Sequence, residues 1–356
     1  MLEGSLGIPQ TIKKLLMNNI VLNLFYEEPD HDRWIKYDRY PRKLIRRLLR
    51  GTPQPGGQMM VALELMRGLD LLKIPYRFND YKYAKRNPNE LIGVIGKSHL
   101  LDEKKFKNPI LFGASIFSHP LEAPNLLQEH PNIKQILVPG EWMKKMFEPN
   151  YGDLVKVWPV GIDTKKWSPS IKKDLKYAFL IYDKIRWNHD FFEKDLIKPI
   201  KSILDKNKLP HTEILYGNYD HEELLEKLAI SRAVIFLCEH ETQGLAYQQI
   251  LSTNTPILAY DQQEFWLDPE YFPNRVKYGP VSAIPYWDEV CGLTFKSIHQ
   301  FGDILNKFQQ KINEQEFYPR KYILTNLSLE KCALAYHQIY IDLANLLEKN
   351  ESPIPS

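Results

Sequence analysis

The clearest structural pattern in the chain is the stretch AVIFLCEHETQGLAYQQILSTNTPILAYD, residues 233–261. An apolar strand runs into a polar turn, a helix begins near Gly244, a turn with Pro256 ends that helix, and a second apolar strand follows. Because the helix starts directly after a strand, the backbone N–H groups of Gly244 and Leu245 lack intrahelical partners and lie at the positive end of the helix dipole. The stretch therefore predicts a parallel α/β sheet with a phosphate-binding site at this turn.

Apolar strands and helical segments alternate along most of the chain in the same way, which is typical of parallel α/β architecture. We predict helices at 56–72 and 328–349, and strands at 19–26, 90–96, 109–115, 135–140, 155–161, 177–182, 212–217, 233–238 and 255–261. Residues 163–175 are polar with a central proline, so we expect them to link two domains. The fold prediction is an α/β chain of two Rossmann-like, doubly wound domains that face each other across a cleft.

The composition agrees with a globular, water-soluble protein. The chain has 356 residues, 44% apolar and 26% charged, which excludes wholesale disorder and suits two domains. Its three cysteines, Cys238, Cys291 and Cys332, form no CxxC pair, so neither a disulfide framework nor a zinc ribbon is expected. Without an apolar run of about 20 residues or a signal-peptide core, we expect a cytoplasmic protein. The net charge of +3 is too small to indicate nucleic acid as a partner.

Positive charge is concentrated in residues 36–50, which hold seven Lys or Arg against one Asp. Within this segment, residues 42–50 have leucine and isoleucine at helical spacing and predict a short basic amphipathic helix. Two interpretations stay open. The helix either contacts an anionic membrane or an anionic acceptor, or it packs its apolar stripe on the domain with a solvated basic face.

From Glu241 to Asp261 the chain resembles the nucleotide-sugar glycosyltransferases of family 4, which have the GT-B fold and retain the anomeric configuration. Their motif places two glutamates, with seven residues between them, between two strands. Glu241 stands at the first glutamate position, Pro256 at the proline, and Gln249 replaces the second glutamate. Since that glutamate usually holds the ribose hydroxyls, the uncharged Gln249 changes the expected ribose contact.

The resemblance extends to other parts of the chain. Gly56 and Gly57 match a Gly-Gly turn that opens the first helix of the family, and residues 155–169 match its domain-closing strand and turn. Residues 318–340 resemble the closing helices, the last of which crosses back to the first domain. The resemblance therefore implies an acceptor domain over 1–165, joined by the helix at 328–349, and a donor domain over 170–325.

The resemblance also implies roles for individual residues. Glu241 would orient the hydroxyls of the donor sugar and support positive charge near the anomeric carbon, and His119 would contact the donor sugar from the first domain. Lys184 and Arg186 are the cations available for the donor diphosphate, although the family spacing is not reproduced because position 189 is His. The expected donor-binding residues are Gly56, Gly57, Lys184, Arg186, Gly244, Leu245 and Gln249.

Together these features predict a retaining glycosyltransferase that moves a sugar from a nucleoside-diphosphate sugar to a glycan, lipid or small-molecule acceptor. We expect no cofactor and no metal. The sequence Asp30-His31-Asp32 resembles the metal-binding D-x-D of the other large glycosyltransferase fold, but its charged surroundings favour a solvated loop. Two alternatives remain: a GT-B epimerase of nucleotide sugars, and a catalytically silent nucleotide-binding module.

Overall fold

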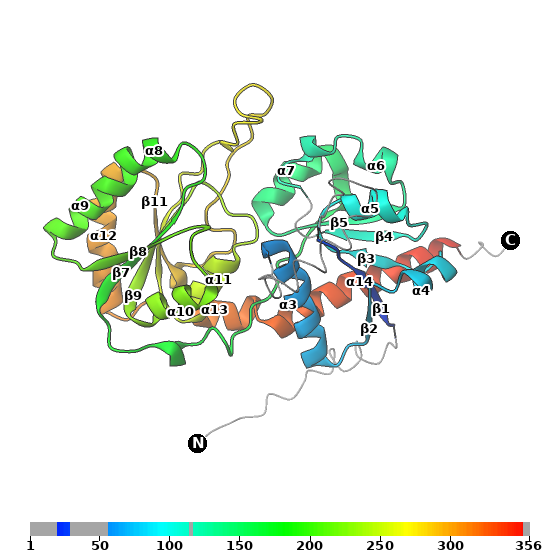
Figure 1. The fold of residues 1–356 in the computed structure, drawn as a ribbon, viewed down its shortest axis with the longest axis horizontal. Helices are drawn as coiled ribbons and strands as arrows, with labels where there is room; N and C mark the ends of the chain where they lie inside the picture. Colours follow the sequence, from blue (N-terminus) through cyan, green and yellow to red (C-terminus); the bar gives the residue numbers. More distant parts are fainter. Residues whose placement is uncertain (1–19, 29–55, 114–116, 352–356) are drawn as a thin grey trace, which may run out of the picture. The chain divides into compact units, whose positions relative to one another are not determined.

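The computed structural model describes residues 20–28, 56–113 and 117–351. The basic segment 36–50 and the pair Asp30 and Asp32 lie outside these ranges. The chain divides into two compact units (Figure 1). Unit 1 comprises the described residues of Met1–Val138, Asn150–Trp158 and Cys332–Ser356, and unit 2 comprises Pro139–Pro149 and Pro159–Lys331.

Unit 1 contains a six-stranded parallel sheet in the order β2-β1-β3-β4-β5-β6. The chain steps outward from β1 to β2 and then continues on the other side of β1, so the order reverses there, as in doubly wound sheets. Its strands are β1 Leu22–Phe25, β2 Tyr76–Phe78, β3 Ile92–Val94, β4 Ile110–Gly113, β5 Ile133–Val138 and β6 Val155–Val157.

The helices of unit 1 include the C-terminal helix α14, Leu329–Glu351, from Cys332 onward. Tyr340 ties this helix to the sheet, because its hydroxyl accepts the N–H of Asn23 at 3.2 Å and donates to the carbonyl of Leu91. Trp158 donates from Nε1 to the Cys332 carbonyl at 2.8 Å. The other helices are α3 Gly57–Leu72, α4 Tyr81–Arg86, α5 His99–Lys104 and α6 Leu126–Glu129.

Unit 2 contains a five-stranded parallel sheet in the order β11-β10-β9-β7-β8, with β7 and β9 at its centre. The strands are β7 Tyr177–Lys184, β8 His211–Leu215, β9 Ser231–Cys238, β10 Ile257–Tyr260 and β11 Gly292–Phe295. Every residue of β9 except Arg232 is buried, since helices cover both faces of the sheet.

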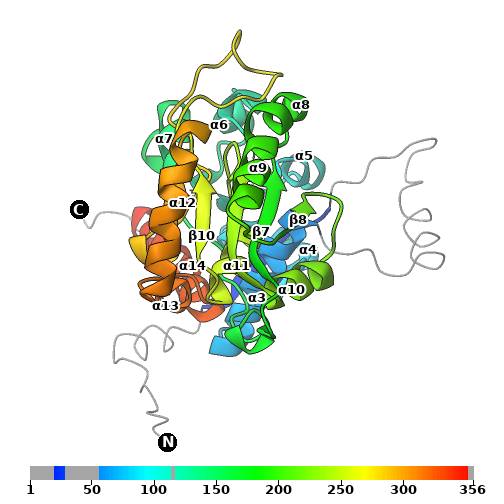
Figure 2. The same ribbon diagram turned by 90° about the vertical axis from the view of Figure 1, so that its left-hand side faces the viewer.

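Two helices lie in front of this sheet in Figure 2: α9, Lys198–Lys206, and α12, Ile298–Asn313. Their apolar stripes, which include Ile200 and Leu305, meet sheet residues such as Ile235 in one buried cluster. The remaining helices are α7 Glu141–Tyr151, whose last two residues belong to unit 1, α8 His189–Phe192, α10 His221–Ala229, α11 Leu245–Ser252 and α13 Pro319–Asn326.

The nine predicted strands are confirmed, and so are the predicted helices at 56–72, after Gly244 and at 328–349; the predicted helix at 42–50 lies outside the described residues. The sequence analysis missed β2 and β11, which have only three and four residues and carry a weak period-2 signal. None of the helices in the described ranges combines the length and the hydropathy that a transmembrane span requires.

The segment 163–175 does not behave as the predicted linker, because it packs within unit 2. Trp167 is only 2% exposed, and its carbonyl accepts hydrogen bonds from Ser252 at 2.5 Å and from Arg320 at 3.1 Å. Lys172 donates to two carbonyls that flank the start of β9. The segment is therefore part of unit 2, and its polar groups are bonded to residues that lie far away in sequence.

Candidate functional site

The candidate site lies at the carboxyl ends of β7 and β9, in unit 2. These strands are parallel neighbours, and the last residue of β7, Lys184, is in register with the last residue of β9, Cys238. The segments that follow both strands therefore leave the sheet side by side. In open parallel sheets this edge is where ligands bind.

Glu239, the first residue after β9, fixes the loop that follows β7. Its Oε1 accepts the backbone N–H groups of Arg186 and Trp187, both at 2.7 Å. Glu239 is 1% exposed, and its Oε2 lies 3.9 Å from Nε of Arg186. A carboxylate buried this deeply needs such compensation, so the two loops are held together by a charge-assisted network.

Arg186 is held on the His240 side as well. One guanidinium nitrogen lies 2.9 Å from Nε2 of His240, and the guanidinium carbon lies 4.7 Å from the ring centre of Trp187. A guanidinium only donates hydrogen bonds, so Nε2 of His240 accepts and the neutral ring carries its proton on Nδ1. Since the Arg186 side chain is still 34% exposed, this arrangement presents a positioned cation to solvent.

His240 stays uncharged. Burial, and then the charges of Arg186 and Lys184, lower the pKa of His240 well below its ordinary value. Its ring packs against three tryptophans, with centroid distances of 5.1–5.5 Å; they are Trp142, Trp187 and Trp266. Rigid aromatic packing of this kind fixes the acceptor nitrogen in front of Arg186.

Lys184 and Glu241, the predicted cation and the predicted catalytic carboxylate, are bonded to each other. Nζ of Lys184 donates to Oε2 of Glu241, while Oε1 of Glu241 accepts the N–H of Thr242 at 3.0 Å. The side chains are 12% and 5% exposed. Burial is the largest influence on the pKa of Lys184 and acts to lower it, but Glu241, Cys238 and Tyr216 together raise it by more, so the pKa is raised. The pair is a nearly buried ion pair.

Helix α11 opens beside this pair. Its N-cap, Gly244, has φ 64°, and a Cβ there would lie 3.2 Å from Glu241 and 3.2 Å from Pro285, so glycine suits both the backbone and the space. The first N–H group of the helix, that of Leu245, lies four residues after Glu241 in the chain. Gln249 lies on the same helix and is 3% exposed.

The other predicted residues belong to unit 1. His119 caps a short 3₁₀ turn, Pro120–Glu122, through Nδ1, which accepts the N–H of Leu121 at 3.1 Å. Gly56 is the N-cap of α3 with an extended backbone, and nothing crowds Gly57. The structure therefore brings Lys184, Arg186, Glu241, Gly244 and Leu245 together, and gives His119 a local capping role.

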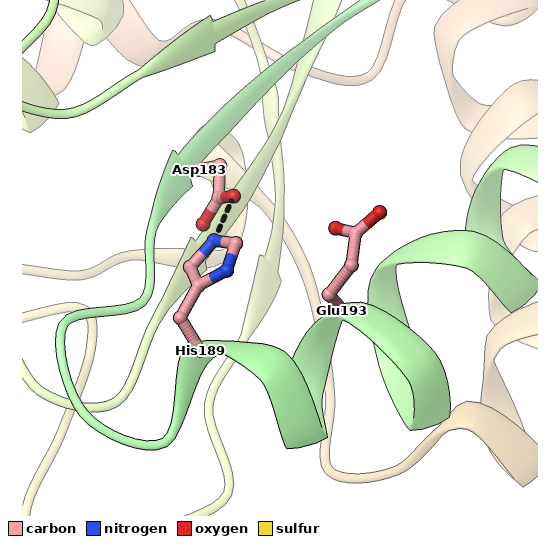
Figure 3. Close-up of side chains that lie close together, drawn as sticks. All are labelled: Asp183, His189 and Glu193. Carbon is pink, nitrogen blue, oxygen red and sulfur yellow. Dashed lines mark hydrogen bonds and ion pairs between the residues drawn. The ribbon is translucent and has the colours of Figure 1, made fainter.

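A second polar cluster, formed by Asp183, His189 and Glu193, surrounds the loop after β7. Figure 3 shows His189 facing Asp183, with Nε2 and Oδ2 2.7 Å apart, and Glu193 on the following turn. Ligand atoms of these three residues lie within 4.8 Å of one another, so they are the group in the described ranges that is able to hold a metal. The close His189–Asp183 contact already orients the ring.

Three residues of the turn after β9 were missed by the sequence analysis: Glu239, His240 and Gln243. All three are at least 93% buried although they are polar. The signal available in sequence was the run EHETQ, which is unusually polar for a segment between two buried elements. Their partners come from the loop after β7, which a single strand pattern does not reveal.

Comparison with known proteins finds likeness in fold. No protein-family model and no curated protein sequence matches the chain. The alpha,alpha-trehalose-phosphate synthase (UDP-forming) from Burkholderia vietnamiensis is 11% identical, with TM-score 0.53, over 85% of this chain and 80% of that chain. The N-terminal domain of Candida albicans trehalose-6-phosphate phosphatase is 11% identical, with TM-score 0.52, over 91% and 97% of the two chains.

A chain from the GtfA/B complex is 13% identical with TM-score 0.47 over 76% of this chain, which spans 63% of that chain's length. At such identities the likeness to the synthase structure and to the phosphatase domain shows a shared fold. The two parallel sheets, flanked by helices, and these matches confirm the predicted α/β fold with two Rossmann-like units, of the GT-B type.

The Lys184–Glu241 pair gives a stability prediction. Changing Lys184 to Met leaves the Glu241 carboxylate buried without its cation, so we expect a loss of about 3–5 kcal/mol in the free energy of unfolding. The double variant Lys184→Met/Glu241→Gln removes both charges and should recover most of that loss. Urea denaturation of the wild type, both single variants and the double variant gives the coupling. Additive single-variant effects would show that the pair makes no net contact.

His240 gives a pH prediction. Because the folded pKa is depressed, the unfolded chain takes up a proton below about pH 6.5 that the folded chain refuses, and stability falls as the pH is lowered. His240→Gln should reduce this slope by about 1.4 kcal/mol per pH unit between pH 6 and 5. Denaturation at several pH values measures it, with the exposed His299→Gln as the control. Equal slopes in wild type and His240→Gln would contradict the assignment.

Proposed function

We propose that the chain is a glycosyltransferase that transfers a sugar from a nucleoside-diphosphate sugar to an acceptor, with retention of the anomeric configuration. The observation that carries the proposal is the group at the carboxyl edge of the unit 2 sheet. There a positioned arginine, an ion-paired glutamate and the N-terminus of α11 follow two adjacent strands. The GT-B fold and the resemblance of residues 241–261 to family 4 support it.

The donor diphosphate is the ligand that this edge suits best. Arg186 is fixed by Glu239 and His240, yet a third of its side chain is open to solvent, which is the state of a cation ready to bind an anion. The N–H groups of Gly244 and Leu245 add donors and the helix dipole. Without ligand the formal charges of Lys184, Arg186, Glu239 and Glu241 cancel.

This charge balance has a consequence for binding. A diphosphate adds negative charge to a neutral cluster, so it gains attraction only where it draws a cation away from its carboxylate partner. Lys184 is the available cation for this exchange, since its Nζ has Glu241 on one side and lies 4.6 Å from the half-exposed ring of Tyr216. We propose that donor binding shares Lys184 between Glu241 and the phosphates.

In the transfer step the bond between the anomeric carbon and the phosphate oxygen breaks, and the acceptor oxygen bonds to that carbon on the same face. The electron pair of the broken bond stays on the leaving phosphate, where Arg186, Lys184 and the α11 N–H groups stabilise it. Glu241 stabilises positive charge on the sugar ring. The acceptor proton passes to the leaving phosphate, so the step needs no separate general base.

We also propose that transfer needs no metal ion, because the cations of the chain and the helix N-terminus take the place that Mg²⁺ has in other sugar transferases. The acceptor is proposed to bind to unit 1. The same unit carries His119 and the Gly56–Gly57 turn, to which the family resemblance assigns contacts with the donor. Peripheral contact with an anionic membrane through residues 42–50 remains a proposal on the sequence.

The central role of Glu241 predicts a defect in turnover. Glu241→Gln keeps the size of the side chain and removes its charge, so kcat should fall at least about 100-fold, while the affinity for nucleoside diphosphate should not fall, because the substitution frees Lys184 from its ion pair. The measurement is nucleoside-diphosphate release from a panel of nucleotide sugars in the presence of candidate acceptors. A kcat equal to that of the wild type would show that Glu241 only holds Lys184 and the N–H of Thr242.

The controls separate the competing functions. Activity that survives a chelator supports the metal-independent mechanism, while activity lost on chelation and restored by Mn²⁺ would direct attention to Asp183, His189 and Glu193, or to Asp30 and Asp32. Interconversion of the donor sugar without any acceptor would indicate an epimerase. Nucleotide binding without turnover of any donor would indicate a silent binding module.

A further inference from the structure

We propose that Gln243 is the residue that reads the hydroxyl groups of the donor sugar. This inference rests on the proposed function and makes one step in it specific. Gln243 lies between Glu241 and the helix N-cap Gly244, and only 7% of its surface is exposed. Neither its Oε1 nor its Nε2 has a hydrogen-bond partner among the described residues.

An amide buried in this way is costly. Removing a primary amide from water without replacing its hydrogen bonds costs roughly 1–3 kcal/mol on protein scales. Native structures contain few such groups, and those that persist call for a ligand, a water or a functional reason. Gln243 therefore has the signature of a side chain whose partner arrives with the substrate.

The neighbouring side chains differ from Gln243 in having at least one hydrogen-bonded polar atom, although Oε2 of Glu239 and Nδ1 of His240 also lack a hydrogen-bond partner among the described residues. Glu241 already accepts one hydrogen bond at each oxygen, from Lys184 and from Thr242. Glu239 holds two backbone N–H groups, and His240 is bonded to Arg186. Within this turn Gln243 is the side chain that has both a donor and an acceptor without partners.

The chemistry of an amide decides which part of a donor it fits. Phosphate oxygens accept hydrogen bonds but do not donate, so a phosphate satisfies Nε2 and leaves Oε1 unpaired. A sugar hydroxyl both donates and accepts, and two hydroxyls on one ring satisfy both atoms together. A site built to bond a hydroxyl rejects an analogue without it, because the buried group is then left unpaired.

The test compares Gln243→Met with wild type. Methionine keeps the length of the side chain and removes both polar atoms, so the unliganded variant should melt at the same temperature as wild type or higher. Calorimetric titration then measures the affinity for the diphosphates UDP, GDP and ADP. It also measures the affinity for the nucleotide sugars UDP-glucose, UDP-galactose, UDP-N-acetylglucosamine, GDP-mannose and ADP-glucose. The wild type should bind at least one nucleotide sugar more tightly than its parent diphosphate, and the variant should lose about tenfold of that gain.

A matched control is the same substitution at Gln248, which lies on helix α11 five residues further along the chain. Gln248 is fully buried and its Nε2 donates to the Val160 carbonyl at 3.1 Å, whereas its Oε1 has no partner among the described residues. Gln248 therefore has one structural hydrogen bond where Gln243 has none. Gln248→Met should lower the melting temperature and leave the gain from the sugar unchanged. This pair distinguishes a side chain that waits for a ligand from one that supports the fold.

Each outcome decides the inference. If Gln243→Met melts clearly below wild type, or keeps the full gain from the sugar, Gln243 is a structural residue and the inference is wrong while the proposed function stands. If the variant weakens the diphosphates as much as the sugars, Gln243 reads the nucleotide instead. If wild type binds none of the nucleotides, the proposed function fails, and the inference fails with it.

Discussion

The buried carboxylate of Glu239 is the constraint on which the candidate site depends. It receives two backbone N–H groups from the loop after β7, and so sets where that loop leaves the sheet. It adds two backbone hydrogen bonds to the Arg186–His240 and Lys184–Glu241 contacts that join the same two segments. Burying a carboxylate this deeply is costly unless such donors and the nearby guanidinium compensate the lost hydration.

This anchoring explains why the site contains so many charges in so little exposed surface. Arg186 and Lys184 each have a carboxylate within reach, and His240 is kept neutral beside them. The cluster is therefore electrically balanced before any ligand binds, and the ion pairs serve to position the side chains. Binding of a charged substrate then works by exchange of partners, which favours a ligand with the geometry to reach several donors at once.

Much of the fold was predictable from sequence, because buried parallel strands and amphipathic helices leave strong periodic patterns. The strand–helix–strand pattern of residues 233–261 located β9, α11 and β10, and the resemblance of that stretch to family 4 selected Glu241. The short strand β2 was not predictable, since its three residues are half buried or exposed. The linker prediction failed because the partners of Trp167, Ser252 and Arg320, come from much later in the chain.

The candidate site was predictable only in part. Cations after β7 and a carboxylate after β9 could be proposed one at a time, but the bond between Lys184 and Glu241 follows from the adjacency of two strands that are more than 40 residues apart. Glu239 and His240 lack a motif of their own, and their importance lies in contacts across the sheet edge. Such contacts depend on strand order, which local patterns do not specify.

The central claim is that this sheet edge holds a diphosphate, and the most direct measurement is the affinity gained from a second phosphate. Calorimetry with UMP and UDP, GMP and GDP, and AMP and ADP, on wild type and Arg186→Met, isolates that gain for each base. The account predicts that one diphosphate binds at least about tenfold more tightly than its monophosphate, and that Arg186→Met removes most of the difference. Equal affinity for mono- and diphosphates, or a gain that Arg186→Met leaves intact, would contradict it.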